Sequence, residues 1–247
     1  MNEQVLTLQW RPAQAWINDW EACSTLPTGL PSLDQGLHRG GLPCGYLSLL
    51  YGDPGAGKTQ LAMHCVVQAA QRYIEPVAVV DTHKTWKIRR LYQMAEAMGV
   101  ADPESVFSKV IVNSVSDFRD QLLSIRGLLE DTTELPVSFV CVDTVLNGKV
   151  ENKVRFRQHI EDLALLARQQ RIPILLVNQV YDRPVTQTEQ RILPRQGPML
   201  SPWTPVWIEL QNTQPIRQGR VLVYQQSRAR FKLEIDAQLS VIPWNEP

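Results

Sequence analysis

Residues 52–59 read GDPGAGKT and match the pattern GxxxxGK[ST]. The apolar run 46–51 before them predicts a strand, and the apolar spacing of residues 59–72 after them predicts a helix. Glycines let successive backbone N–H groups point inward, and the helix dipole adds positive potential at the same place. The segment therefore predicts a phosphate-binding loop, with a tight glycine-rich turn as the alternative. Its candidate nucleotide-binding residues are Gly52, Asp53, Pro54, Gly55, Ala56, Gly57, Lys58 and Thr59.

A metal site is predicted beside this loop. In loops of this pattern the lysine, here Lys58, supplies a positive charge to the β- and γ-phosphates, and the hydroxyl of Thr59 ligates Mg²⁺. The apolar run 137–143 predicts a buried strand that ends in Asp143, whose carboxylate would hold the Mg²⁺ through water. A cap or a turn at the strand end is the alternative role for Asp143.

Apolar runs alternate with helical patterns along most of the chain, which predicts an α/β fold. The expected strands are 46–51, 76–81, 106–112, 137–143 and 172–177. The expected helices are 30–37, 59–72, 87–98, 117–129 and 156–170. This order predicts a mostly parallel central sheet with helices on both faces. Three further runs predict a C-terminal antiparallel extension: 206–210, 220–224 and 231–235. The expected domains are a lead-in or oligomerisation linker at 1–24 and a core at 25–247.

The composition narrows the function classes. The 247 residues carry 25 basic and 25 acidic side chains, so the net charge of +0 excludes a uniformly basic nucleic-acid coat but not a local basic loop. The 4 cysteines lack CxxC spacing, which disfavours a disulfide framework or structural zinc. The N-terminus lacks a leader pattern, and no apolar run reaches the roughly 20 residues of a membrane helix. A soluble, intracellular protein without a membrane partner is expected, nuclear in a eukaryote and cytoplasmic or nucleoid-associated in a prokaryote.

Several short motifs follow one another in a characteristic order. They are Thr28-Gly29, Ser32-Leu33-Asp34, Gly40-Gly41-Leu42-Pro43, Lys58-Thr59-Gln60-Leu61, Asp143-Thr144 and Asn178-Gln179-Val180-Tyr181. Together they resemble the ATPase core of the RecA/RadA recombinases, from about residue 10 to about residue 242. Only about 24 residues precede the core, which matches the short paralogs of that family, archaeal RadB-like or eukaryotic. The resemblance implies a RecA-type P-loop NTPase core with ATP and Mg²⁺ as cofactors.

The resemblance also assigns roles to residues around the nucleotide. Gln60 belongs to the Lys58-Thr59-Gln60-Leu61 segment with which the phosphate loop ends. Arg90 matches an arginine that stacks on adenine, and an ordinary surface arginine is the alternative. Gln179 matches the residue that senses the γ-phosphate and leads into a DNA-contacting loop. An amide that caps a strand end is the alternative for Gln179. Lys58 and Gln179, together with His83, are the implied catalytic residues.

Two basic segments match the DNA-contacting loops of the family. Residues 147–159 hold Lys149, Lys153, Arg155 and Arg157. Residues 183–204 hold Arg183, Arg191 and Arg195. These side chains would contact the phosphates of single-stranded DNA. A solvated helix face is the alternative for the first segment.

Three departures from the family pattern limit these expectations. Active members carry an acidic residue that positions the attacking water, where this chain has His83. An imidazole differs in reach and carries no negative charge, so slow hydrolysis is expected. The chain has no room for the helix-hairpin-helix domain of full recombinases. Residues 198–203 and 226–230 replace a Gly-Gly and a Leu-Pro-Glu motif, which puts strand exchange and a shared interface nucleotide site in doubt.

The segment Trp10-Arg11-Pro12-Ala13 matches the aromatic-x-x-Ala plug by which recombinases dock on a neighbouring subunit. Trp10 and Ala13 would then mediate a homo- or hetero-oligomer with recombinase or paralog subunits. The alternative is a tryptophan that folds back on its own core.

These observations support three hypotheses. The first is a recombinase paralog that binds ATP with Mg²⁺, hydrolyses it slowly and assists homologous recombination and DNA repair as an accessory. The second is an active DNA-dependent ATPase with strand-exchange activity. The third is a KaiC-type or helicase-type ATPase without a role in repair.

Overall fold

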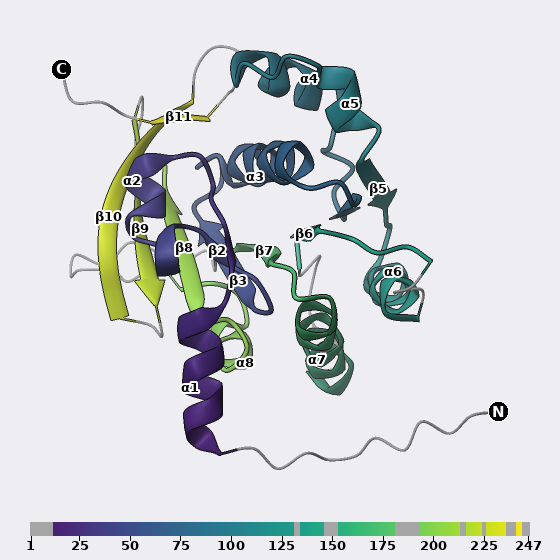
Figure 1. Cartoon of the computed structure of the whole chain (residues 1–247), viewed down its shortest axis with the longest axis vertical. Helices are drawn as coiled ribbons and strands as arrows, with labels where there is room; N and C mark the ends of the chain where they lie inside the picture. Colours follow the sequence, from purple (N-terminus) through teal and green to yellow (C-terminus); the bar gives the residue numbers. More distant parts are fainter. Residues whose placement is uncertain are drawn as a thin grey trace.

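A central sheet organises the molecule, and the computed structural model describes residues 12–130, 134–145, 153–180, 193–212, 216–223, 226–235 and 241–243. Within these ranges the sheet has nine strands in the order β11-β10-β9-β8-β3-β7-β6-β4-β5 (Figure 1). The strands are β3 (Leu47–Gly52), β4 (Val77–Asp81), β5 (Val110–Ser114), β6 (Phe139–Asp143), β7 (Ile174–Gln179), β8 (Val206–Gln211), β9 (Ile216–Val223), β10 (Gln226–Ile235) and β11 (Val241–Pro243). A separate small sheet pairs β1 (Thr25–Leu26) with β2 (Leu42–Pro43).

Helices cover both faces of the sheet, as the sequence predicts. The helical elements are α1 (Ala13–Ala22), α2 (Pro31–Asp34), a 3-10 turn (His38–Gly40), α3 (Lys58–Arg72), α4 (Ile88–Ala97), α5 (Pro103–Phe107), α6 (Phe118–Glu130), α7 (Lys153–Gln170) and α8 (Gly197–Leu200). Figure 1 shows α3, α4 and α5 on one side of the sheet and α6 and α7 on the other. Two buried apolar clusters fill the two interfaces between helices and sheet.

Six neighbouring strands of the sheet, β8-β3-β7-β6-β4-β5, run parallel to one another. The predicted α/β class is confirmed. β3 lies between β7 and β8 and pairs parallel with both. One detail of the sequence prediction is wrong, because the run 206–210 belongs to the parallel part and not to the antiparallel extension. The chain returns to the same end of the sheet before it enters β8, so this strand points along β3. The antiparallel part begins with β9 and continues through β10 and β11.

A second correction concerns the predicted strand 106–112, whose first residues are helical. Pro103 occupies the first turn of α5, and the Asp102 carboxylate accepts a hydrogen bond from the N–H of Ser105 at 3.2 Å. These are helix-start signals, and they prevail over the alternating apolar pattern. The strand therefore starts only at Val110.

The segment before the core contains a helix that the sequence reasoning did not predict. α1 buries Trp20, whose ring stacks on His38 with centroids 4.1 Å apart and meets the Tyr46 ring edge-on at 4.9 Å. Aromatic packing of this kind attaches the helix to the core. Ala13, a predicted oligomerisation residue, is the exposed first residue of α1, whereas Trp10 lies outside the described residues.

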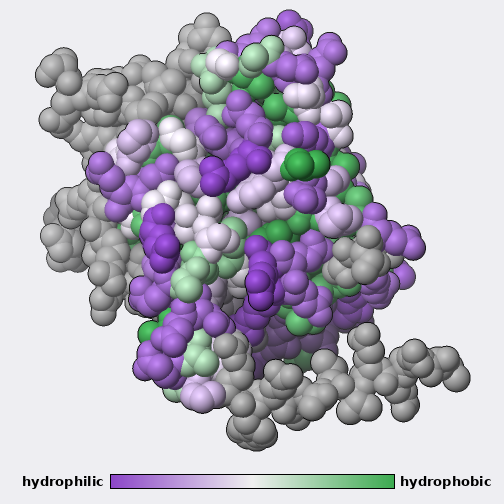
Figure 2. All heavy atoms as spheres, viewed as in Figure 1, coloured by the Kyte–Doolittle hydropathy of each residue, from purple (hydrophilic) through white to green (hydrophobic). Residues whose placement is uncertain are grey.

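The face of the molecule seen in Figure 2 is mainly polar. Figure 2 shows hydrophilic residues over most of the viewed face, with small separate apolar areas among them. In the described parts of the chain, no helix combines the length and the apolar character needed to cross a bilayer.

Candidate nucleotide-binding site

The carboxyl ends of the parallel strands bring the predicted site residues to one edge of the sheet. Gly52 of β3 is in register with Gln179 of β7 and with Leu210 of β8. Asp81 of β4 is in register with Asp143 of β6. In sheets of this kind, ligands bind at the carboxyl edge of the strands. The fold thus gathers the phosphate loop, the predicted metal carboxylate and the predicted sensor glutamine.

The phosphate loop has the backbone geometry of an anion site. Gly55 and Gly57 adopt positive φ values of 72° and 90°, which favour glycine. Gly57 is the N-cap of α3, and no side chain caps the helix there. The first N–H groups of α3 are therefore available to an anion, and the helix dipole reinforces them. This donor set fits the phosphates of a nucleotide.

Lys58 provides the positive charge of the loop. Its Nζ donates to the carbonyl oxygens of Gly52 at 3.0 Å and of Asp53 at 2.8 Å. Burial lowers the pKa of this ammonium, while the nearby carboxylates of Asp143 and Asp53 raise it. Backbone carbonyls thus hold the ammonium inside the loop, where its charge complements a phosphate.

β8 supports the loop from behind, through a residue that sequence reasoning missed. Asn212 follows β8; its N–H donates to Asp53 Oδ2 and its Nδ2 to the Pro54 carbonyl, each at 3.1 Å. A Cβ on Gly52, whose φ is 155°, would collide with the carbonyl of Leu210. Only the pairing of β3 with β8 reveals these contacts, since 158 residues separate Asn212 from Pro54.

Asp143, the predicted metal residue, lies buried at the end of β6 with 2% of its surface exposed. Its Oδ2 accepts a hydrogen bond from the indole Nε1 of Trp86 at 3.0 Å. Burial raises the pKa of this carboxyl, and hydrogen bonds from Trp86 and Thr59 lower it. The neighbouring Asp81 raises the pKa further and His83 lowers it. The structure therefore brings Thr59 and Asp143, the two predicted metal residues, into contact, and their oxygen donors suit Mg²⁺.

The loop after β4 is organised by Asp81. This carboxylate is 1% exposed and accepts hydrogen bonds from the N–H groups of His83 and Thr85, both at 3.2 Å, and of Trp86 at 3.0 Å. Three backbone donors on one buried carboxylate fix the conformation of the loop. The same loop therefore aims Trp86 at Asp143. In the sequence, the only sign of this arrangement of Trp86 is an aspartate at a strand end, Asp81, five residues before it.

His83 and Gln179, the two remaining predicted catalytic residues, meet across the edge of the sheet. Their Nε2 atoms lie 3.3 Å apart, and the His83 side chain is exposed. The amide Nε2 of Gln179 can only donate, so His83 Nε2 accepts in this contact. The position that is acidic in the recombinase pattern is thus occupied by an imidazole in contact with the predicted γ-phosphate sensor.

Hydrogen bonds attach one part of the predicted DNA loop 183–204 to the end of β7, directly beside Gln179. The N–H of Arg195 donates to the Gln179 carbonyl at 2.8 Å, and Asn178 Nδ2 donates to the Arg195 carbonyl at 2.7 Å. Val180 and Pro194 form an antiparallel bridge at the same level. Pro194 and Arg195, two residues within the predicted loop, are therefore attached to the strand that carries Gln179.

The remaining predicted residues fall into three groups. Arg90 Nε donates to Gln60 Oε1 at 3.0 Å, so these two candidate nucleotide residues lie together. Lys153, Arg155 and Arg157 are exposed at the start of α7, where Arg157 pairs with Glu161 at 3.1 Å. The candidate DNA-binding residues outside the described ranges are Lys149, Arg183 and Arg191.

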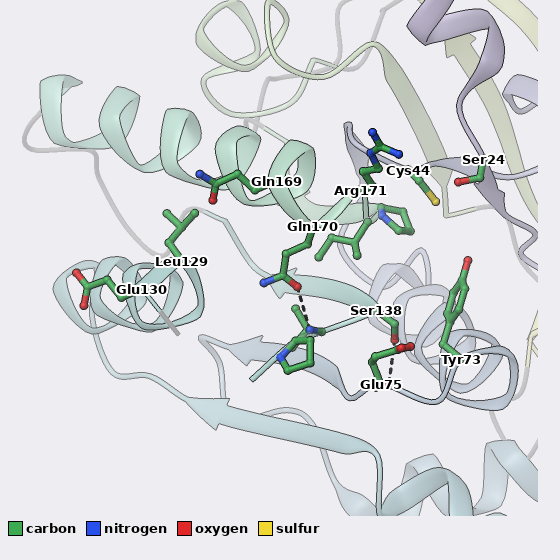
Figure 3. A pocket seen from close by; sticks show the side chains of 14 residues that line it. Ser24, Cys44, Tyr73, Glu75, Leu129, Glu130, Ser138, Gln169, Gln170 and Arg171 are labelled. Carbon is green, nitrogen blue, oxygen red and sulfur yellow. Dashed lines mark hydrogen bonds between the residues drawn. The ribbon is translucent and has the colours of Figure 1, made fainter. Parts of the chain in front are cut away.

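A cavity of about 790 Å³ lies at the opposite edge, near the amino ends of the strands (Figure 3). Its polar lining includes Glu75, Glu130 and Arg171. Gln170 and Ser138 bind neighbouring backbone: Gln170 Oε1 accepts from the Val137 N–H at 2.9 Å, and Ser138 Oγ donates to the Glu75 carbonyl at 3.0 Å. None of the predicted site residues lines this cavity, so it is separate from the phosphate loop.

The fold and the site together define a P-loop ATPase domain of the RecA type. The family model described as "ATPase: KaiC" matches residues 26–193. The DNA repair and recombination protein RadB of Thermococcus kodakarensis is 34% identical over 162 residues, which are 63% of this chain and 70% of that protein. RadB of Halobacterium salinarum is 31% identical over 191 residues, 72% of this chain and 77% of the relative.

A solved structure agrees with the fold. The crystal structure of the RadB recombinase superimposes with a TM-score of 0.73 at 24% identity, over 89% of this chain and 100% of that one. The chain belongs to the KaiC-like ATPases and, among them, to the RadB family of recombinase paralogs in recombination and repair. The resemblance inferred from the short motifs is thereby confirmed.

Proposed function

We propose that this RadB-family protein binds ATP with Mg²⁺ at the phosphate loop and hydrolyses the nucleotide slowly. The left-handed glycines, the uncapped start of α3 and Lys58 support the binding of the phosphates. Thr59 and Asp143 would hold the Mg²⁺, which supplies charge neutralisation on the phosphates when bound. The observation that carries the proposal of slow turnover is the 3.3 Å contact between His83 and Gln179.

The hydrogen bonds of the nearby carboxylates support the proposal of slow turnover. Asp81 is 1% exposed and accepts three backbone N–H groups, so its oxygens already have partners. Asp143 is bonded by Trp86 and Thr59 and is assigned to the metal. His83 is therefore the base candidate in this loop. An imidazole has no negative charge with which to orient water, and positioning of the nucleophile is a large part of catalysis in phosphoryl transfer.

In this proposal the nucleotide state regulates an accessory role in homologous recombination and DNA repair. Gln179 would report the γ-phosphate, and its carbonyl oxygen accepts a hydrogen bond from the N–H of Arg195. Arg195 belongs to the predicted DNA loop, together with Arg183 and Arg191. That loop and the basic start of α7 would contact single-stranded DNA, and Trp10 with Ala13 would dock on a recombinase or paralog subunit. The family assignment and the attachment of Arg195 to Gln179 support this role.

A steady-state ATPase assay with and without single-stranded DNA tests the proposal. We expect turnover below about 1 s⁻¹, the lower end of typical enzyme rates, in both conditions. DNA-stimulated turnover well above this value would contradict slow hydrolysis and favour an active recombinase. DNA binding through Lys153, Arg155 and Arg157 should weaken steeply as salt rises, because phosphate contacts release counterions.

A further inference from the structure

Trp86 makes a polar contact with Asp143, the predicted metal carboxylate. The indole Nε1 donates to Asp143 Oδ2 at 3.0 Å, and the ring is partly buried against the apolar cluster on the α3 side of the sheet. The backbone N–H of Trp86 donates to Asp81 Oδ2 at 3.0 Å. The backbone and the ring of Trp86 are therefore both held in place. This fixes the position of the indole N–H donor.

The contact restricts how the Asp143 carboxylate can lie. The terminal torsion of an aspartate is broad, so a buried carboxylate needs hydrogen bonds to select one orientation. The indole N–H donates to Oδ2, and the Thr144 hydroxyl donates to Oδ1 at 3.4 Å. Thr59, which begins α3 together with Lys58, also hydrogen-bonds to this carboxylate. The orientation that Trp86 selects is thus one in which Asp143 meets the hydroxyl of the phosphate loop.

We propose that Trp86 is a positioning residue for the nucleotide-bound cation, because its indole N–H orients the Asp143 carboxylate beside Thr59. This inference rests on the proposed function, namely Mg²⁺-dependent binding of nucleotide at the phosphate loop. Trp86 acts through Asp143 and needs no contact of its own with nucleotide or metal. Loss of the outer partner of a metal-binding carboxylate costs about 10- to 100-fold in metal affinity.

The Trp86→Phe variant of the full chain keeps an aromatic ring and removes the N–H donor. Binding of a non-hydrolysable ATP analogue is measured by calorimetry while Mg²⁺ is titrated, and again in EDTA. We expect the Mg²⁺ concentration for half-maximal tight binding to rise about tenfold. Affinity in EDTA should stay within about twofold, because the phosphate loop is untouched. Trp16→Phe is the matched control, since Trp16 lies 47% exposed on α1.

A double-mutant cycle separates positioning from general packing. In the Asp143→Asn background, Trp86→Phe should change the Mg²⁺ dependence by less than about twofold, because its effect passes through the missing carboxylate. An equal loss of affinity with and without Mg²⁺, an undiminished effect in Asp143→Asn, or a Mg²⁺ requirement equal to or below that of the wild type would each overturn the inference. Wild-type protein whose nucleotide binding ignores Mg²⁺ would instead overturn the proposed function itself, and the inference with it.

Discussion

The phosphate loop and the neighbouring ends of β4 and β7 are built in different ways. The loop depends on backbone: left-handed Gly55 and Gly57, the N-terminus of α3, and carbonyl oxygens that hold Lys58. The other region depends on side chains, because His83 meets Gln179 and Trp86 meets Asp143. A site built from backbone groups in a glycine-dependent conformation tolerates few residue types. A site built from side chains changes its chemistry with one substitution. Nucleotide binding and nucleotide hydrolysis can therefore diverge on an unchanged fold.

The largest effect on nucleotide affinity should come from Lys58→Ala, which removes the charge of the loop. We expect nucleotide affinity to fall more than about 100-fold, or about 2.7 kcal/mol, by calorimetry. Lys109→Ala is the matched control, because Lys109 Nζ also donates to two backbone carbonyls, those of Ala70 and Tyr73, both at 3.0 Å. Unchanged affinity in Lys58→Ala would refute the assignment of the phosphate loop.

Gly52→Ala should break the support that β8 gives to the loop. The new Cβ would collide with the Leu210 carbonyl at a φ of 155°, so we expect a loss of about 3 kcal/mol in the free energy of unfolding. Chemical denaturation measures this change. Gly127→Ala is the control, because Gly127 lies in α6 with no atom within 4 Å of its added Cβ and should gain up to about 1 kcal/mol. Equal effects in the two variants would contradict the packing between β3 and β8.

Two buried histidines, His64 and His159, make the fold acid-sensitive. Burial lowers the pKa of His64 on α3 to about 4 and that of His159 on α7 to about 3. The unfolded chain binds more protons between these values and about 6.5, so stability falls as the pH drops below about 6.5.

We expect a loss of about 2 kcal/mol for each of these histidines between pH 7 and pH 5, measured by urea denaturation at a series of pH values. His159→Gln should flatten this slope, whatever its effect on stability at pH 7. A slope that is the same in wild type and variant would show that His159 is not buried in its neutral form.

His83→Glu tests directly how the side chains at the ends of β4 and β7 affect hydrolysis. A carboxylate at this position would orient the attacking water, so we expect turnover to rise about tenfold or more with little change in nucleotide affinity. A steady-state ATPase assay measures the rate. His83→Gln, which has no charge, should give no such gain. A rate that stays unchanged in His83→Glu would mean that another feature limits hydrolysis.

Asn212→Ala should have the smallest effect. It removes the side-chain bond to the Pro54 carbonyl and leaves the backbone bond to Asp53 in place. We expect a loss of about 1 kcal/mol, or about fivefold in nucleotide affinity. Asn113→Ala is the control, since Asn113 donates to Ser124 on an exposed surface. A loss as large as that of Lys58→Ala would place Asn212 in direct contact with nucleotide.

The sequence predicted the elements that have strong local signals. The runs before Gly52 and Asp143 are strands, and α3 follows the phosphate loop as its pattern requires. It misassigned residues 106–109 because the alternating apolar pattern of 106–112 overlaps a helix turn that starts at a proline. It also missed the parallel direction of β8, because strand direction depends on how the chain returns to the sheet and leaves no periodic signal.

By itself, the sequence determined the residue types of the site: the glycines and Lys58 of the loop, Asp143 at a strand end, and His83 in place of an acid. Motifs are local, so their chemistry can be inferred without coordinates. Only the tertiary structure decided that Trp86 bonds to Asp143 and that Asn212 supports the loop, across 57 and 158 residues of sequence. Such contacts arise because parallel pairing places distant strand ends side by side, and a one-dimensional pattern does not encode that neighbourhood.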